Sequence, residues 1–307
     1  MSKRVALANH PKYLPVLVTA TGKTTPMAPP SFRFAYPRVL SIAGSDSSGG
    51  AGIQADLKTI AALGCYGMTA ITALTAQNTL GVRAIHGVPT DMLLHQIDAV
   101  VEDIGVDAVK IGMLHSPDIV QAVARVIDRY ALKNVVLDPV MVATSGAVLI
   151  EQSAVAALVR HLFARATLVT PNLDEAALLV GKPLDSETAI ECAARELLDM
   201  GAAAVLLKGG HLPGAHVSDL LMTADGQTHW MRAPRIRTAN THGTGCTLSS
   251  AIAAYLALAL PLVDAVEAAR HFVRAALQAG AQVQTGAGSG PLNHGHAPQA
   301  MQLKPLW

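Results

Sequence analysis

The sequence predicts an α/β protein with a mostly parallel central sheet, and three observations support this. From about residue 38 onward, short apolar or β-branched runs alternate with longer segments of helical periodicity. Hydrophobic residues make up 51% of the chain but aromatic residues only 4%, as expected for a parallel sheet whose two faces are covered by helices. The 307 residues are enough for one large core. A single α/β domain is therefore favoured over two smaller ones.

Six segments are expected to form strands, and helices fill the intervals between them. Repeated strand–helix–strand units give a parallel sheet with right-handed crossovers. The expected strands are residues 39–45, 69–76, 108–114, 135–140, 168–171 and 204–208. The expected helices are residues 53–63, 92–104, 117–130, 153–163, 187–200 and 247–260. Residues 219–237 instead have the pattern of a hairpin around Asp225-Gly226, which predicts an antiparallel edge late in the chain.

Composition narrows the classes of partner and location. A formal net charge of +1 provides no field that would attract nucleic acid or anionic lipid. The longest apolar run, residues 251–260, is about half of the ~20 residues that a membrane span needs. The three cysteines, Cys65, Cys192 and Cys246, are far apart and odd in number, which argues against a disulfide framework or a zinc site. We therefore expect a soluble, cytoplasmic protein without nucleic-acid or membrane partners.

The N-terminal segment is expected to lie outside the folded domain. Residues 1–36 contain five prolines and little apolar periodicity, so they predict a mobile extension. Near the other end, His294 and His296 lie in a glycine-rich tail and are expected to be solvated. The twelve histidines form no metal-binding motif.

The most informative segment is Asn240–Thr247, where a glycine-rich turn runs directly into an apolar helical segment. A helix start presents unsatisfied N–H groups and the positive end of the helix dipole, which favour phosphate and the negative charge of phosphoryl transfer. The same field is expected to lower the pKa of Cys246 and make its thiol a proton acceptor. For this segment alone, a glycine-rich loop before a core helix with a small buried cysteine is an equally good interpretation.

Other polar motifs follow the expected strands, where open α/β sheets bind ligands. Gly44–Gly52 has four glycines but not the spacing of a dinucleotide fingerprint. Asn172 and Glu175 lie three residues apart on one helix face, where they could orient Mg²⁺-bound water and a nucleotide phosphate or simply cap the helix.

Three further polar residues end apolar strands. Burying the ammonium of Lys208 at the end of an apolar strand is costly unless it pairs with an anion such as a phosphate. The alternative is that Lys208 lies at the surface and extends its ammonium into solvent. Gln77 offers donors and acceptors suited to a polar heterocycle, or it has a turn role. Asp138 is either structural or close to a metal.

Taken together and in order, six motifs closely resemble the bacterial hydroxymethylpyrimidine/phosphomethylpyrimidine kinases of thiamine biosynthesis, which belong to the ribokinase-like superfamily. The motifs are Ala43–Asp56, Ala76–Thr79, Lys110–Leu114, Thr170–Asn172, Lys208–His211 and Thr241–Cys246. The resemblance runs from about residue 38 to roughly residue 295. It implies a ribokinase-like three-layer αβα sandwich over residues 37–295, followed by a tail at 296–307.

The resemblance also implies two successive ATP-dependent phosphorylations with Mg²⁺. The first acts on the hydroxymethyl group of 4-amino-5-hydroxymethyl-2-methylpyrimidine and the second converts the monophosphate to the diphosphate. The family further suggests a homodimer. At matching positions, Gln77 would hydrogen-bond the aminopyrimidine, and the residues that would line its pocket are Gly44, Ala51, Met113 and Val140.

The resemblance assigns the remaining site residues to phosphate and catalysis. Asn172 and Glu175 would organise Mg²⁺ and phosphate, with Glu175 acting through water and Asp138 as a further metal candidate. Lys208 would approach the nucleotide phosphates. The anion hole would consist of the amides of Gly243, Thr244, Gly245 and Cys246. Cys246 would be the base, and it follows the pyrimidine kinase branch, since most sugar kinases of the superfamily have Asp there.

Three alternatives stay open. Pyridoxal kinase activity is the nearest, because relatives of this fold phosphorylate a hydroxymethyl group on a ring of similar size, although Gln77 favours the aminopyrimidine. A non-catalytic pyrimidine-binding module would keep Gln77 but could lose the anion hole, Lys208 or Cys246. A nucleotide-dependent oxidoreductase would contain bound nicotinamide or flavin.

Overall fold

The computed structural model describes residues 16–18, 24–26, 32–141, 150, 152–211 and 214–306. The chain divides into two compact units, one formed by Tyr36–Gln302 and the other by the two ends, 1–35 and 303–307. In the unit formed by the ends, β1 (Val16–Val18) pairs with β2 (Thr24–Pro26), and β3 (Phe34–Ala35) pairs with β13 (Lys304–Pro305). Most of the expected N-terminal extension lies outside the described residues, so its mobility stays a prediction.

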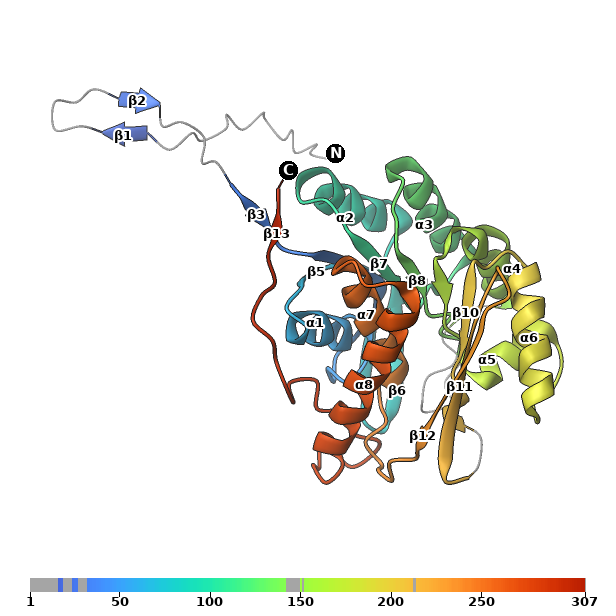
Figure 1. Cartoon of the computed structure of the whole chain (residues 1–307). Coiled ribbons are helices and arrows are strands. Elements are labelled where there is room, and N and C mark those ends of the chain that lie inside the picture. The colour runs from blue at the N-terminus through green and yellow to red at the C-terminus, as the bar shows by residue number, and fades with distance from the viewer. Residues whose placement is uncertain are drawn as a thin grey trace. The chain divides into compact units, whose positions relative to one another are not determined.

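A nine-stranded sheet runs through the larger unit (Figure 1), in the order β12-β11-β10-β9-β8-β7-β4-β5-β6. Its central strands are parallel: β5 (Tyr66–Asn78), β4 (Arg38–Asp46), β7 (Ala108–Ile111), β8 (Val135–Leu137), β9 (Leu168–Val169) and β10 (Ala204–Leu207). These correspond to the six expected strands.

Both edges of the sheet are antiparallel. At one edge, β11 (His216–Thr223) and β12 (Thr228–Pro234) form the hairpin that the sequence predicts. At the other edge, β6 (Gly81–Gly87) pairs with β5 and was not expected, because its seven residues begin and end with glycine and lack a strong strand pattern. The antiparallel strands thus flank the parallel centre on both sides.

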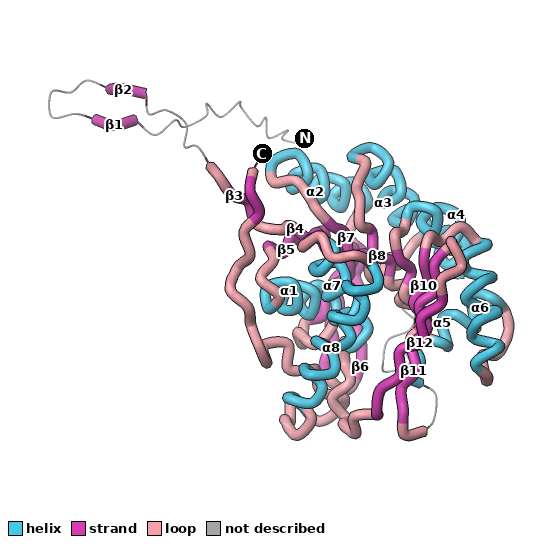
Figure 2. The backbone as a smooth tube through the Cα atoms, in the orientation of Figure 1, coloured by secondary structure: helices cyan, strands magenta, loops and turns pink. Residues whose placement is uncertain are grey.

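Helices cover both faces of the sheet (Figure 2). The helices on one face are α1 (Gly52–Ala62), α7 (Thr244–Ala257) and α8 (Leu262–Gly280). Those on the other face are α2 (Thr90–Asp103), α3 (Pro117–Tyr130), α4 (Gln152–Leu162), α5 (Leu173–Val180) and α6 (Glu187–Asp199). Short 3₁₀ turns lie at Phe163–Arg165 and Gly209–His211. Each face has its own apolar core, which confirms the three-layer αβα architecture.

Local sequence explains where the helices begin. Ser116 caps α3 by accepting the N–H of Ile119, and Ser186 caps α6 in the same way. By contrast, α7 begins at Thr244, and its N-cap residue is Gly243, which has a φ of 80° and no side chain that could cap the helix. The first N–H groups of α7 are therefore available to a ligand. None of the described helices is both long and apolar enough to cross a membrane.

Candidate functional site

A cavity of about 770 Å³ lies beyond the carboxyl ends of the parallel strands. Each of these strands contains a lining residue or ends within three residues of one: Gln77 for β5, Gly44 for β4, Met113 for β7, Asp138 for β8, Asn172 for β9 and Lys208 for β10. The other expected site residues also line this cavity, namely Ala51, Val140, Glu175, Gly243, Thr244, Gly245 and Cys246. The fold thus brings together every residue that the sequence suggested for binding or chemistry.

The start of α7 forms the floor of the cavity. A side chain at Gly243 would collide with the carbonyl of Gly50, and φ there is positive, so glycine is needed at this turn. The N–H of Thr244 donates to the Thr241 carbonyl at 3.2 Å. Within the described chain, the N–H groups of Gly245 and Cys246 make no hydrogen bond. The amide of Thr244, one of the four expected in the anion hole, is thus engaged in a turn.

Cys246 is the third residue of α7, and the residue is partly exposed. Burial raises the pKa of Cys246 to about 11, against the lowering influence of Lys110 and of a hydrogen bond from the Gly52 backbone. Asp56 and Asp138 raise the pKa further. The expectation of a lowered pKa is therefore wrong for the unliganded chain, because desolvation outweighs the helix start. At neutral pH this thiol is protonated.

Lys208 lies at one end of the cavity, paired with Asp138. Its Nζ is 2.8 Å from Asp138 Oδ1, and the side chains are 15% and 1% exposed. Burial acts to raise the pKa of Asp138, but Lys208 and Lys110 outweigh it and lower the pKa. An ideal Cβ on Gly245 would be 3.2 Å from Lys208 Nζ, so the ammonium lies against the first turn of α7. Lys208 is therefore a site residue and not a surface lysine.

Asn172 and Glu175 form a complete capping box at the start of α5. The Asn172 side chain accepts the N–H of Glu175, and Glu175 accepts the N–H of Asn172, both at 2.8 Å. The capping interpretation is confirmed, yet both residues also line the cavity. Burial raises the pKa of Glu175 to about 7, with Lys208 lowering it and Asp138 raising it. Structural and ligand-binding roles can therefore coexist.

Among the carboxylates that line the cavity, Asp138 and Glu175 are the two that the sequence suggests as ligands for a divalent cation. Within the described residues no group of three or more His, Cys, Asp or Glu side chains could hold a metal ion. Mg²⁺ in nucleotide sites is bound by one or two carboxylates together with phosphate oxygens and water. These two residues therefore fit Mg²⁺ that enters with a nucleotide.

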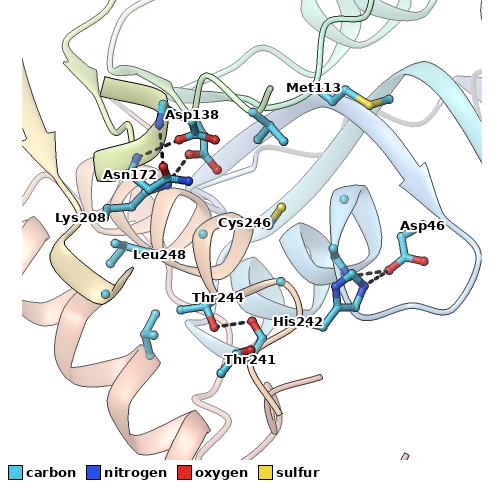
Figure 3. Close-up of a pocket in the computed structure, with 18 of the residues that line it drawn as sticks. Asp46, Met113, Asp138, Asn172, Lys208, Thr241, His242, Thr244, Cys246 and Leu248 are labelled. Carbon is cyan, nitrogen blue, oxygen red and sulfur yellow. Dashed lines mark hydrogen bonds and ion pairs between the residues drawn. The ribbon is translucent and has the colours of Figure 1, made fainter. Parts of the chain in front are cut away.

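The opposite end of the cavity contains Gln77. Its Oε1 accepts a hydrogen bond from Thr75 Oγ1 at 3.2 Å, and its Nε2 is 3.4 Å from His242 Nε2. His242 Nε2 is also 2.8 Å from Asp46 Oδ2. Burial acts to raise the pKa of Asp46, but hydrogen bonds from His242 and the loop amides outweigh it and hold the pKa at about 2. Figure 3 shows Cys246 between two groups of residues. Met113 and Asp46 lie on one side of it, and Lys208 and Asp138 lie on the other.

Several cavity residues were not assigned from the sequence. His242 and Asp46 belong to the quoted motifs but had no separate signal, because their pairing joins residues 196 positions apart. Lys110 lies within the apolar strand β7, where an ammonium is costly to bury, so the reasoning applied to Lys208 could have found it. Apolar side chains that were not assigned from the sequence also line the cavity, among them Val217, Ile236, Leu248, Val273 and Leu277.

One expectation outside the cavity is wrong. His294 is 4% exposed and not solvated, and its Nε2 is 3.0 Å from Thr247 Oγ1. Thr247 in turn bonds the carbonyl of Gly243 through both its N–H and its hydroxyl. Through Thr247, His294 therefore stabilises the turn at the start of α7.

Known proteins resemble this chain over most of its length. The model of the family described as phosphomethylpyrimidine kinase matches residues 46–293. The hydroxymethylpyrimidine/phosphomethylpyrimidine kinase of Rhizobium meliloti is 50% identical over 258 residues, 84% of this chain and 96% of that protein.

Two solved structures resemble this fold. The phosphomethylpyrimidine kinase of Clostridium difficile 630 is 42% identical with a TM-score of 0.68 and covers 77% of this chain and 97% of its own. An ADP complex of Bacillus subtilis pyridoxal kinase is 37% identical with a TM-score of 0.76 and covers 85% of this chain and 98% of its own. With the family model spanning most of its length and a relative at 50% identity, the chain belongs to the phosphomethylpyrimidine kinase family.

Proposed function

We propose that this protein transfers the γ-phosphoryl group of ATP to 4-amino-5-hydroxymethyl-2-methylpyrimidine and then phosphorylates the monophosphate to the diphosphate, in thiamine biosynthesis. One observation supports this most strongly. The free N–H groups at the start of α7 lie in one cavity with Gln77 and Lys208. Such a cavity can bind a polar ring on one side of the anion site and a triphosphate on the other.

Positioning and charge stabilisation account for most of the expected chemistry. The N–H groups of Gly245 and Cys246 can receive the charge that builds up on the transferring phosphoryl group. Lys208 is close enough to the same turn to neutralise the phosphates once it leaves Asp138. Mg²⁺, held by Glu175 and Asp138 with the phosphates, would neutralise further phosphate charge.

The acceptor end is suited to an aminopyrimidine. The Gln77 carboxamide can donate to a ring nitrogen and accept from the exocyclic amine. Met113 and Val140 provide apolar contacts for the ring, and Gly44 leaves room because a Cβ there would be 2.5 Å from Met113 Cε. In its thiolate form, Cys246 would accept the proton of the hydroxymethyl group in the first step.

The test is a product analysis of the purified protein. Incubation with ATP, Mg²⁺ and hydroxymethylpyrimidine should produce the monophosphate first and the diphosphate later, resolved by mass. Detection of ADP without a phosphorylated pyrimidine would contradict the proposal, and so would a monophosphate that is never converted further.

Pyridoxal kinase activity is the second candidate, favoured by the 37% identity to the pyridoxal kinase structure. Gln77 supports the aminopyrimidine as the better substrate. The two substrates are compared side by side at equal concentration, and a higher kcat/KM for pyridoxal would reverse the assignment.

A catalytic role is favoured over a non-catalytic pyrimidine-binding module, because Lys208, Cys246 and the free amides all line the same cavity as Gln77. A homodimer in the cytoplasm completes the proposal. Light scattering of the purified protein tests the dimer.

A further inference from the structure

Two contacts, one helical turn apart, connect α1 to α7. The backbone of Gly52 hydrogen-bonds the sulfur of Cys246, and the hydroxyl of Ser250 donates to Asp56 Oδ1 at 2.6 Å. Gly52 and Asp56 are four residues apart on α1, as are Cys246 and Ser250 on α7. Residues four apart lie on the same helix face. Asp56 therefore lies one turn deeper than the thiol, on the surface that α1 and α7 share.

Lys110, at the end of β7, completes this arrangement from the sheet. Its side chain is 0% exposed, and its Nζ is 2.9 Å from both carboxylate oxygens of Asp56. Ser41 donates to Asp56 Oδ2 at 2.6 Å, so the carboxylate has four donor contacts with Ser250 included. An ammonium has three N–H groups. Among the described residues, Asp56 is the hydrogen-bond partner of Lys110, which leaves one N–H for another acceptor.

Lys110 also lies at the wall of the proposed reaction site. Although it is closed to solvent, Lys110 lines the cavity together with Cys246 and Gly52. An ideal Cβ on Gly112 would be 2.8 Å from Lys110 Nζ, so the glycine makes space for the ammonium.

Four charged groups act on the thiol, each from a different element. Lys110 from β7 and Lys208 after β10 are cationic, while Asp56 from α1 and Asp138 after β8 are anionic. Burial is the strongest influence on the pKa of Cys246 and raises it, and Lys110 is the strongest influence that opposes burial. Lys110 is thus the group placed to favour a thiolate at this position.

We infer that Lys110, held in place by Asp56, is a positioning residue that stabilises the thiolate form of Cys246, the form that accepts the proton of the substrate hydroxyl. This inference rests on the proposed function for its chemical step. In that step the proton moves from the hydroxyl oxygen to sulfur and the oxygen bonds to the γ-phosphorus of ATP. The bond from that phosphorus to the bridging oxygen breaks, and ADP leaves with the electron pair.

A structural role is the competing explanation, since the Lys110–Asp56 pair also joins β4, β7, α1 and α7. Buried ion pairs can often be replaced by neutral groups without loss of the fold. The variant Lys110→Met with Asp56→Asn removes both charges together and leaves no unpaired ion. The apparent pKa of Cys246 then separates the two explanations, because an ion pair with a purely structural role would not change the ionisation of this thiol.

The first experiment measures alkylation of Cys246 by iodoacetamide over a pH series. Cys65→Ser and Cys192→Ser are introduced so that Cys246 is the single thiol. In the double charge variant the apparent pKa of Cys246 should rise, with alkylation about tenfold slower per unit of pKa at any pH below it. An unchanged profile, or one shifted to lower pH, would overturn the inference.

The matched control is Arg38→Met with Asp107→Asn. This ion pair of 2.9 Å also joins β4 to the segment before β7, but at the amino ends of the strands. Its removal should leave the alkylation profile of Cys246 unchanged. If the Lys110–Asp56 variant does not fold, Ser250→Ala takes its place, since it removes one donor from Asp56 and should shift the profile in the same direction by less.

The second experiment compares the two phosphorylations separately. The Lys110–Asp56 variant should slow phosphorylation of the hydroxymethyl group by about tenfold or more and that of the monophosphate by less than about threefold, since only the first acceptor must lose a proton. Equal losses in both steps would contradict the inference. Should the parent protein fail to phosphorylate the pyrimidine, the proposed function falls, while the alkylation profiles still decide the link between Lys110 and Cys246.

Discussion

The ammonium of Lys208 and the carboxylate of Asp138 are 2.8 Å apart at the edge of the cavity, and Asp138 is the more deeply buried of the two. The hydroxyls of Thr170 and Ser249 also donate hydrogen bonds to the Asp138 carboxylate, at 3.2 and 3.3 Å, and hold it in place. The lysine can therefore exchange its partner while the aspartate stays in place. An entering triphosphate would compete with Asp138 for Lys208 and leave the carboxylate free to face Mg²⁺.

Replacing Lys208 should affect ATP far more than the pyrimidine. Lys208→Met removes a cation beside the free amides of α7, and we expect kcat/KM for ATP to fall by about 100-fold or more, the size of effect typical for groups that stabilise a transition-state charge. The KM for the pyrimidine should change little. Steady-state kinetics with each substrate varied in turn provide the measurement. Lys182→Met, which removes an exposed lysine paired with Glu196, is the control.

Substitution of Cys246 should distinguish the two phosphorylations. In Cys246→Ala and Cys246→Ser the first step should lose more activity than the second, because the hydroxymethyl group must lose a proton whereas the monophosphate already offers an anionic oxygen. Single-step assays with each acceptor measure the two rates. Cys192→Ser, at an exposed position of α6, serves as the control. Equal losses in the two steps would rule out a proton-accepting role for Cys246.

The sequence predicts the location of the site better than its electrostatics. Periodicity places Gln77, Asp138 and Lys208 at the ends of parallel strands, and a parallel sheet brings such ends together whatever the loops do. The glycine pattern likewise locates the start of α7. These inferences need only local patterns and the topology of the fold.

Ionisation could not be read from the sequence, because it depends on neighbours that are distant along the chain. The helix start alone suggests a low pKa for Cys246, but the depth of the thiol and its proximity to Asp56 and Asp138 reverse the direction. The burial of His294 has the same origin, since Thr247 is 47 residues away from it. The edge strand β6 was missed because its pairing with β5 depends on tertiary contacts more than on its own composition.

Glu175 should make the unliganded protein less stable as the pH rises. Its pKa in the folded chain is about 7, above the ordinary value of 4.5, first because of burial and then because of Asp138. Because the pKa of Glu175 is higher in the folded than in the unfolded chain, the stabilising contribution of the protonated side chain is fully present below about pH 4.5. This contribution is lost as the pH rises through about 7. Glu175→Gln should therefore raise the Tm relative to the parent above about pH 7, while activity falls.

Thermal unfolding of the unliganded protein over a pH series is the measurement for Glu175. Glu196→Gln, at a partly exposed position of α6, is the control and should leave the shape of the profile unchanged. A Glu175→Gln variant that is less stable than the parent at every pH would show that the capping contact outweighs the burial of the charge.

His294 should have the opposite effect over nearly the same pH range. Burial, with the charges of Lys58, His242 and His296, lowers its pKa from 6.5 to about 4. A lowered histidine pKa means that the unfolded chain binds the extra proton more readily, so stability is lost as the pH falls from about 6.5 to about 4, by as much as about 3 kcal/mol.

The effects of Glu175 and His294 on stability have opposite signs and should partly cancel in the parent protein, so its stability should change little between about pH 4.5 and 6.5. Substitution of either residue should then reveal the pH dependence caused by the other. The hydroxyl proton of Thr247 is donated to Gly243, so His294 donates to Thr247 through Nε2. With its pKa at about 4, the imidazole is uncharged at neutral pH and Nδ1 carries no proton. His294→Asn keeps a donor that cannot be charged, and its Tm should fall with rising pH because the effect of Glu175 is then unopposed. His216→Asn, at an exposed position of β11, should keep the parent's flat profile. If His294→Asn is as flat as the parent, His294 does not titrate between the folded and unfolded states in the way its burial requires.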